Sequence, residues 1–409
     1  MKASLSRSVA ILLIIMTMTA VTGCNQEEVI NNSSKIIAEI ITNSLEDKET
    51  ESISHEQIIG EDDPEAIEQH ISTTPNSNEC WRNGVYEYYF NQLTAEQQAI
   101  YNQLYETVAS MQNRAIISID GLAQDELSVI FRSIRYDHPE IYWIQGYNFI
   151  QTSEIIELYP KYLVAAEKKS LYDDQLAGWT EKALSNIDLE DMTDYEKEIA
   201  IYDYIVKNTN YDLDSDMNQS LISVVQGESV CLGYTKSMKY LCDRIGLECI
   251  IIEGTSKEGI NHSWNKIIIN KNWYNVDSTN SNTAQIFSDN YDMFNITDKL
   301  IKNRYTERQI SCDCGRINFV YPVADNIKED YYNRKGLYID RLEEIESLIN
   351  NHINEGTITI RLGEQIEIEK IQEYMKDLKI KTNDNNQKEK KCTSFVIMEY
   401  IRLLQINWK

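Results

Sequence analysis

The hydrophobic period changes between residues 229 and 277, and this change constrains the fold more than any other feature of the sequence. A helical spacing comes first, carried by Tyr234, Met238, Leu241 and Ile245. Gly246 supplies a helix stop, and the pattern beyond it predicts strands at 248–253, 262–269 and 273–277. Between the first two of these strands, Gly254–Ile260 reads as a mobile loop. The pattern therefore predicts one helix followed by three strands.

Cys231 lies where this helix is predicted to begin. Ser229 is the predicted N-cap, which places Cys231 in the first turn of the helix. There the helix macrodipole and the free backbone N–H groups favour an anion, and therefore the thiolate form of Cys231. The position predicts a reactive cysteine.

His262 and Asp277 belong to the two strands that follow, and the turn between those strands decides whether the two side chains can meet. A two-residue turn at Asn270-Lys271 pairs His262 with Thr279 and puts Asp277 on the same face, diagonal to His262. A three-residue turn would put His262 and Asp277 on opposite faces. Contact between them therefore demands the first register.

A thiol, an imidazole and a carboxylate in this arrangement are what covalent acyl chemistry requires. Cys231 would attack an amide carbonyl and His262 would carry the proton, while Asp277 would orient the ring and stabilise the imidazolium. Of the five histidines in the chain, only His262 lies in a strongly patterned context. We therefore expect these three residues to form the catalytic site.

Three linked motifs also carry a resemblance to a known family: Val-Cys231-x-Gly-Tyr-x-Lys, Asn-His262-Ser-Trp-Asn and Asn-Trp-Tyr-Asn-Val-Asp277. Their order and spacing resemble the transglutaminase-like superfamily over about residues 191–297. The resemblance implies a papain-like α+β core, with the nucleophile helix on an antiparallel sheet, and a triad of Cys231, His262 and Asp277. The backbone N–H of Cys231 should contribute to an oxyanion hole, whereas the choice between Gln226 and Tyr211 as a side-chain donor stays open.

The first 24 residues are typical of an exported lipoprotein. Lys2 and Arg7 precede an apolar run at 9–21, which is too short to span a bilayer core of about 30 Å and suits a signal peptide. The run ends in Val21-Thr22-Gly23-Cys24, which resembles the lipobox of bacterial lipoproteins. The resemblance implies cleavage after residue 23, lipidation of Cys24 and attachment to the extracytoplasmic face of the cell membrane. An ordinary secretory peptide with an incidental cysteine is the alternative.

The charge of the chain bears on its partners. Its 409 residues include 39 Lys and Arg against 65 Asp and Glu, a formal charge of −26, which argues against nucleic acid as a partner. Fourteen of the acids fall in residues 25–80 against two bases, and we expect a disordered acidic tether over 24–80. The negative charge mildly favours basic protein or peptide partners.

Three folded parts are expected after the tether: an α+β unit at 81–165, the transglutaminase-like core at 166–325 and an α+β appendage at 326–409. In the first part, Thr94 and Gln97 form a capping box that predicts the start of a helix. His138, beside a proline, reads as a loop residue rather than a ligand. The final segment, Ser394–Trp408, reads as one apolar strand or helix.

Two pairs stand out among the other six cysteines. Cys242 and Cys249 lie at apolar positions and read as core residues. Cys312-Asp-Cys314-Gly brings two thiols close together, but no second pair or nearby histidine completes a zinc site. An exported chain permits disulfides, although the sequence does not choose among the pairings.

These observations predict a membrane-anchored thiol enzyme that acts on amide bonds of proteins or peptides through a thioester at Cys231. The triad alone does not separate transamidation from deamidation or proteolysis. The chemistry requires no cofactor and no metal. The alternative is a catalytically silent lipoprotein that uses the same groove to bind peptides or cell-wall material.

Overall fold

The computed structural model describes residues 80–118, 122–152, 154–214, 217–279, 291–378 and 392–408. Apart from 258–260, these residues belong to one compact unit. The predicted leader, Cys24 and the acidic segment up to residue 79 lie outside the described residues, so the lipid attachment and the tether stay predictions. None of the helices in the described ranges combines the length and the apolar character that crossing a membrane requires.

The first described segment builds a small antiparallel sheet with helices beside it. Its strands pair in the order β3-β5-β4, with β3 at Ala115–Ser118, β4 at Ile144–Gln151 and β5 at Ile155–Tyr162. Two helices that contact each other accompany the sheet, α3 (Ala95–Ala109) and α4 (Gln124–Asp137). Helix α3 begins at the predicted capping box, in which Thr94 N donates to Gln97 Oε1 at 2.9 Å. Two short strands, β1 (Trp81–Arg82) and β2 (Val85–Tyr86), precede these elements.

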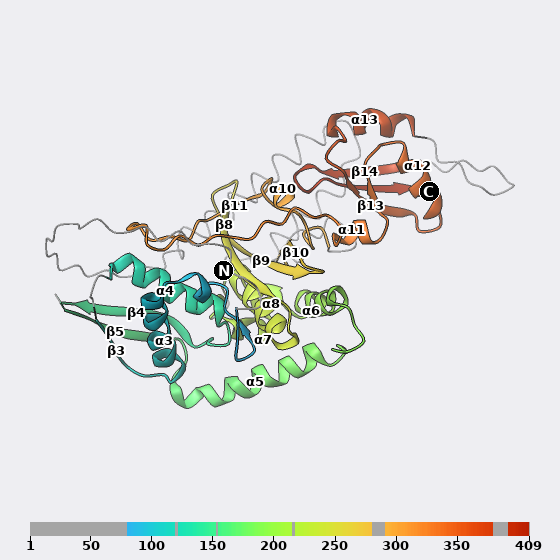
Figure 1. The fold of residues 1–409 in the computed structure, drawn as a ribbon. Helices are drawn as coiled ribbons and strands as arrows, with labels where there is room; N and C mark the ends of the chain where they lie inside the picture. The colour runs from blue at the N-terminus through green and yellow to red at the C-terminus, as the bar shows by residue number, and fades with distance from the viewer. Residues whose placement is uncertain are drawn as a thin grey trace, which may run out of the picture. The chain divides into compact units, whose positions relative to one another are not determined.

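The central part of the chain consists of helices followed by a second antiparallel sheet. The helices are α5 (Ala166–Leu184), α6 (Asp194–Asn208), α7 (Leu221–Gln226) and α8 (Cys231–Ile245). The strand order is β10-β9-β8-β11, with β8 at Cys249–Ser256, β9 at Asn261–Ile269, β10 at Asn272–Val276 and β11 at Tyr305–Glu307. Helix α8 packs against β8 and β9 (Figure 1). The predicted α+β class, with the cysteine-bearing helix on an antiparallel sheet, is confirmed.

Two short strands lie on either side of α7. Strand β6 (Asn210–Tyr211) and strand β7 (Glu228–Ser229) pair in parallel, so the chain returns beside the end of α6 before it enters α8. Ser220 caps α7 by accepting from Ile222 N, and Gly227 ends it in the left-handed region at a φ of 94°. This return places Ser229 beside Tyr211, two residues before Cys231.

The C-terminal part forms a third sheet. Its order is β12-β13-β15-β14, with β12 at Tyr338–Ile339, β13 at Thr357–Leu362, β14 at Cys392–Met398 and β15 at Leu403–Trp408. This part also contains the helices α12 (Glu344–Asn351) and α13 (Ile368–Asp377), while α10 (Asp298–Ile301) and α11 (Tyr331–Arg334) are single turns. The prediction of one element over Ser394–Trp408 is wrong. Arg402, at a φ of 53°, ends a short turn that folds this segment into two paired strands.

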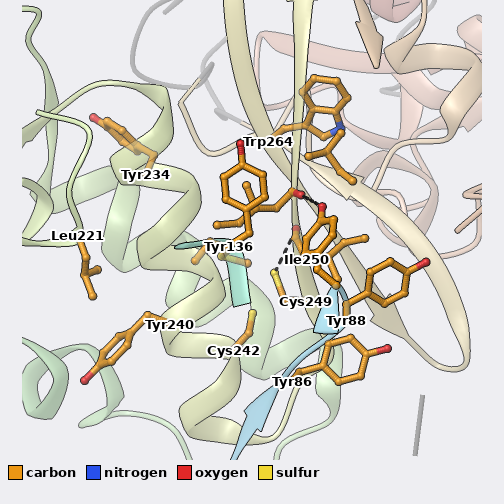
Figure 2. Close-up of a cluster of buried hydrophobic side chains, with 14 of the residues drawn as sticks. Tyr86, Tyr88, Tyr136, Leu221, Tyr234, Tyr240, Cys242, Cys249, Ile250 and Trp264 are labelled. Carbon is orange, nitrogen blue, oxygen red and sulfur yellow. Dashed lines mark hydrogen bonds between the residues drawn. The ribbon is translucent and has the colours of Figure 1, made fainter. Parts of the chain in front are cut away.

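One buried apolar cluster runs through the first and second sheets, and a separate cluster fills the C-terminal part. In Figure 2, Cys242 on α8 and Cys249 on β8 lie between the helix and the sheet among buried aromatic rings. Both thiols are fully buried, as predicted for core residues. The domain boundaries expected from the sequence stay predictions.

The prediction of a mobile loop from Gly254 is wrong at its start. Strand β8 continues to Ser256, and Gly254 pairs with His262 across the sheet. A Cβ on Gly254 would lie 2.3 Å from Thr306 O on β11 and 2.8 Å from the Trp264 ring. The glycine is therefore explained by the close approach of β11 and Trp264, which the sequence pattern alone does not reveal.

Candidate active site

Cys231 is the first residue of α8, so its backbone N–H belongs to the first turn of the helix. Val230 is the N-cap, and its side chain makes no capping hydrogen bond. The prediction that Ser229 caps the helix is therefore wrong by one residue. The Ser229 hydroxyl instead donates to Asn218 O at 2.8 Å and lies 2.6 Å from Ser223 Oγ. These contacts fix the segment that leads into Cys231 against the residues that precede it.

The motif around Cys231 is explained by the packing of this segment. A Cβ on Gly233 would lie 1.9 Å from Ser229 Oγ, so only glycine fits there. Tyr234 OH donates to Thr209 O at 2.8 Å, and Lys236 Nζ donates to Gln219 O at 2.9 Å. Glycine, tyrosine and lysine of the motif thus fix the start of α8 against the chain that precedes it.

The β9–β10 turn has the register that brings His262 and Asp277 together. Asn272 pairs with Ile269 and Val276 with Asn265, which is the register of a two-residue turn. Asn270 and Lys271 have φ values of 50° and 68°, so both central residues are left-handed, as type I′ hairpin turns require. The register predicted from a two-residue turn is confirmed.

His262 and Asp277 form a hydrogen-bonded pair. His262 Nε2 lies 2.8 Å from Asp277 Oδ2, and the side chain of Asp277 is fully buried. Asp277 Oδ1 also accepts from Thr279 N at 3.1 Å, and Asp277 N donates to Met293 O at 3.0 Å. The carboxylate therefore has a fixed orientation toward the imidazole.

The electrostatics of the pair favour the imidazolium. Burial alone would lower the pKa of His262, but the charge and hydrogen bond of Asp277, followed by those of Cys231, raise it to about 9. Burial would raise the pKa of Asp277, but the His262 cation more than offsets this and holds it below its ordinary value. Near neutral pH, His262 is therefore a cation between a carboxylate and a sulfur.

The three predicted residues meet at one place. Cys231 lies close enough to the imidazole to contribute to the raised pKa of His262. Since Asp277 engages Nε2, the Nδ1 atom is the ring nitrogen left for the sulfur. A helix-terminal sulfur, an imidazolium and a buried carboxylate in this order can carry out nucleophilic attack, proton delivery and ring orientation.

Two neighbours of His262 on β9 dock the strand onto α8. Ser263 Oγ lies 3.0 Å from Thr235 Oγ1, and Asn265 Nδ2 donates to Thr235 O at 3.1 Å. Thr235 Oγ1 donates in turn to Cys231 O at 2.7 Å. The helix that carries the sulfur is therefore tied to the strand that carries the imidazole by buried hydrogen bonds.

Residues 182–278 match the family model described as the transglutaminase-like superfamily. The chain contains a transglutaminase-like core. The match covers α6, α7 and α8 and the strands β8, β9 and β10, and it includes Cys231, His262 and Asp277. The resemblance seen in the three motifs is thus confirmed for this segment.

Two solved structures are similar to parts of this chain. One is a TGase, 14% identical with a TM-score of 0.25, over 43% of this chain and 52% of that one. The other is a candidate cysteine protease from Cytophaga hutchinsonii, 13% identical with a TM-score of 0.23, over 41% of this chain and 64% of that one. At such TM-scores these similarities carry no weight in the assignment. A comparison with curated proteins gave no match.

Tyr305 is a site residue that the sequence did not indicate. Its ring stacks on His262 with the centroids 4.3 Å apart, and its hydroxyl donates to Asp277 Oδ2 at 3.2 Å. Burial raises the pKa of Tyr305 well above its ordinary value, so the phenol stays a donor. The Arg304 guanidinium lies over the rings of Tyr305 and Tyr400, and its charge also lowers the pKa of Asp277.

The side-chain oxyanion donor stays open. Tyr211 pairs with Ser229 through the backbone, which places it beside the segment leading into Cys231. Gln226 ends α7, and a left-handed glycine separates it from β7. The roles of Tyr211 and Gln226 as oxyanion donors therefore stay predictions.

Proposed function

We propose that this chain is a thiol enzyme of the transglutaminase-like class that acts on amide bonds of proteins or peptides. The observation that carries the proposal is the contact order Cys231–His262–Asp277, with the sulfur at a helix start and the carboxylate buried. This order supplies a nucleophile and a proton carrier, with an orienting anion hydrogen-bonded to the proton carrier.

The proposed reaction begins with attack of the Cys231 thiolate on the amide carbon. The C–N bond then breaks, His262 delivers its proton to the leaving nitrogen, and a thioester remains on the sulfur. Water or a primary amine next attacks the thioester, His262 takes up the proton of the incoming group, and the thiolate is released. Asp277 stays ionised throughout and stabilises the imidazolium. The N–H of Cys231 is the proposed backbone donor to the oxyanion.

The choice of acceptor decides the product. Ammonia leaves when a glutamine side chain is attacked, and an amine such as lysine then gives transamidation, whereas water gives deamidation. Attack on a peptide bond followed by water gives proteolysis. The formal charge of −26 mildly favours basic peptides as partners, since opposite charges attract at long range.

We also propose that the enzyme acts on the extracytoplasmic face of the cell membrane, anchored through lipid on Cys24. The first 24 residues support this proposal. Two basic residues precede a short apolar run, and the small residues Thr22 and Gly23 come directly before Cys24. Expression of the full chain and its Cys24→Ser variant in bacteria, with a radiolabelled fatty acid, tests this. Label and membrane association should both disappear in Cys24→Ser, and equal labelling of the two forms would overturn the anchor.

The experiment that tests the activity is mass spectrometry of a mixed peptide library incubated with wild type and with Cys231→Ala. Cross-linked peptides, deamidated glutamines or new peptide ends should appear with wild type and be absent with Cys231→Ala. Cys392→Ser is the matched control, because Cys392 is another partly exposed thiol, placed in β14. Unchanged peptides with an intact Cys231 thiol would overturn the enzyme and favour a peptide-binding module.

A further inference from the structure

A second pair of thiols lies in a hairpin that follows β11. Ser311 pairs with Asn318, and Cys312 N donates to Ile317 O at 2.9 Å. Gly315 makes the turn at a φ of 74°, and its N–H donates to Cys312 O at 3.0 Å. The tip of the hairpin therefore carries Cys312 and Cys314 in a well-defined turn.

The tip is held on the N-terminal end of α4, beside which the orange segment runs in Figure 1. Asp125 Oδ2 accepts from Asp313 N and, at 3.3 Å, from Cys314 N. Arg316 forms an ion pair with Glu126 at 2.6 Å. These contacts fix the backbone on both sides of Cys314.

The two sulfurs lie 2.7 Å apart. Asp125, Cys312 and Cys314 place one ligand atom each within 4.8 Å of one another, so a metal has to be considered. Two thiolates on one tetrahedral zinc lie about 3.8 Å apart, given Zn–S bonds of about 2.3 Å. Both carboxylate oxygens of Asp125 already accept backbone N–H groups, Oδ2 from Asp313 and Cys314 and Oδ1 from Glu126. The spacing and the occupied carboxylate favour a bond between the sulfurs over a metal between them.

The pair is chemically asymmetric. Cys314 is partly exposed, and the Arg316 guanidinium lies within hydrogen-bonding reach of its sulfur. Cys312 is buried, and burial, followed by the hydrogen bond with Cys314, raises its pKa to about 11. An accessible sulfur next to a guanidinium, with a buried thiol beside it, is an arrangement suited to attack and resolution in disulfide exchange.

We propose that Cys312 and Cys314 are a redox-active dithiol that low-molecular-weight disulfides oxidise to an intramolecular disulfide. The Cys314 thiolate attacks one sulfur of the small disulfide, whose S–S bond breaks and whose other half leaves as a thiol after taking a proton. Cys312 then loses its proton and attacks the Cys314 sulfur, which expels the second small thiol. Two protein thiols are oxidised while one small disulfide is reduced to two thiols.

The test uses the reduced full chain and glutathione disulfide as the probe, with acid quenching, alkylation and peptide mass spectrometry. In wild type, the peptide with both cysteines should lose two hydrogens and resist alkylation. Cys312→Ser should retain a glutathione adduct on Cys314, whereas Cys314→Ser should leave Cys312 unmodified because it is buried. Cys392→Ser should behave as wild type at the pair. Arg316→Gln should slow the exchange about three- to tenfold.

Two results would overturn the dithiol. One is complete alkylation of both thiols after treatment with glutathione disulfide. The other is protection of both thiols by one equivalent of Zn²⁺ that Asp125→Asn abolishes, since this would make the cluster a metal site. Neither outcome depends on Cys231. A failure of the dithiol proposal can therefore be distinguished from a failure of the proposed amide chemistry.

Discussion

The ring of Tyr305 stacks on the imidazole of His262, with the two planes at 22°, and its hydroxyl donates to the Asp277 oxygen that His262 contacts. Tyr305 lies on β11, which pairs with β8 next to the strand of His262. One side chain thus limits both rotation of the imidazole and rotation of the carboxylate. We regard Tyr305 as a positioning residue.

Tyr305→Phe should keep the stacking and lose the hydrogen bond to Asp277. We expect kcat/KM for the amide reaction to fall roughly 10- to 100-fold, since a hydrogen bond to a charged group is worth roughly 1.5–3 kcal/mol. The fall should appear in kcat rather than in KM, because the hydroxyl faces Asp277. Tyr305→Leu, which also loses the stacking, should lose more activity. Wild-type kcat in Tyr305→Phe would contradict the positioning role.

The pH dependence of the reaction should report the pKa of His262. The reactive form needs the imidazolium, and because the pKa of His262 is raised to about 9, kcat/KM should fall as the pH rises through about 9. Asp277→Asn removes the charge that raises this pKa, so the falling limb should move to lower pH and kcat should drop by about 10²–10⁴-fold. Asp173→Asn, which breaks a surface ion pair with Lys169, is the control. If kcat/KM fell at the same pH in Asp277→Asn as in wild type, Asp277 would not be the residue that raises the pKa of His262.

His138 should make stability depend on pH in the same range. It is buried between Glu87 and Glu140, with ring nitrogens 2.8 and 2.7 Å from their oxygens. Burial would lower the pKa of His138, but these two partners raise it to about 9. The contribution of protonated His138 to the free energy of unfolding is therefore fully present below about pH 6.5 and is lost as the pH rises through about 9. The difference in free energy of unfolding between wild type and His138→Gln, measured in urea, should shrink over that range. A constant difference would show that His138 is neutral at all these pH values.

Gly233→Ala should disturb the start of α8. The new Cβ would lie 1.9 Å from Ser229 Oγ, and the required shift should lower the free energy of unfolding by about 1–3 kcal/mol and displace Cys231. Ser229→Ala in the same chain removes the colliding oxygen and should restore part of the stability. Gly178→Ala on α5 is the matched control, since nothing lies within 4 Å of its Cβ position. Equal unfolding midpoints for the two alanine variants would refute the packing explanation.

Much of the site could be predicted because its determinants are local. The change from helical to strand period placed Cys231 at the start of α8, and Asn270-Lys271 decided the register that brings Asp277 to His262. The helix start was predicted one residue early because Ser229 looks like a cap in sequence. In the fold, its hydroxyl is used to hold Asn218 and Ser223 instead.

The remaining features depend on contacts between distant segments. Tyr305 reaches His262 only because β11 pairs with β8, and nothing in the residues around it marks that pairing. The sequence predicted that His138 is a loop residue. In the fold His138 is buried, because Glu87, 51 residues earlier in the chain, lies against its ring. The sequence predicted that Gly254 begins a mobile loop, but in the fold β11 and Trp264 lie so close to Gly254 that a side chain would not fit.

The central claim is that His262 and Asp277 activate Cys231, and site-resolved alkylation tests it most directly. Wild type, His262→Gln and Asp277→Asn would be treated with iodoacetamide at pH 6–7, and the rate at each cysteine followed by peptide mass spectrometry, with Cys392 as the internal reference. The claim predicts that Cys231 reacts faster than Cys392 in wild type and slows markedly in both variants. Equal rates at Cys231 and Cys392, unchanged in His262→Gln, would contradict it.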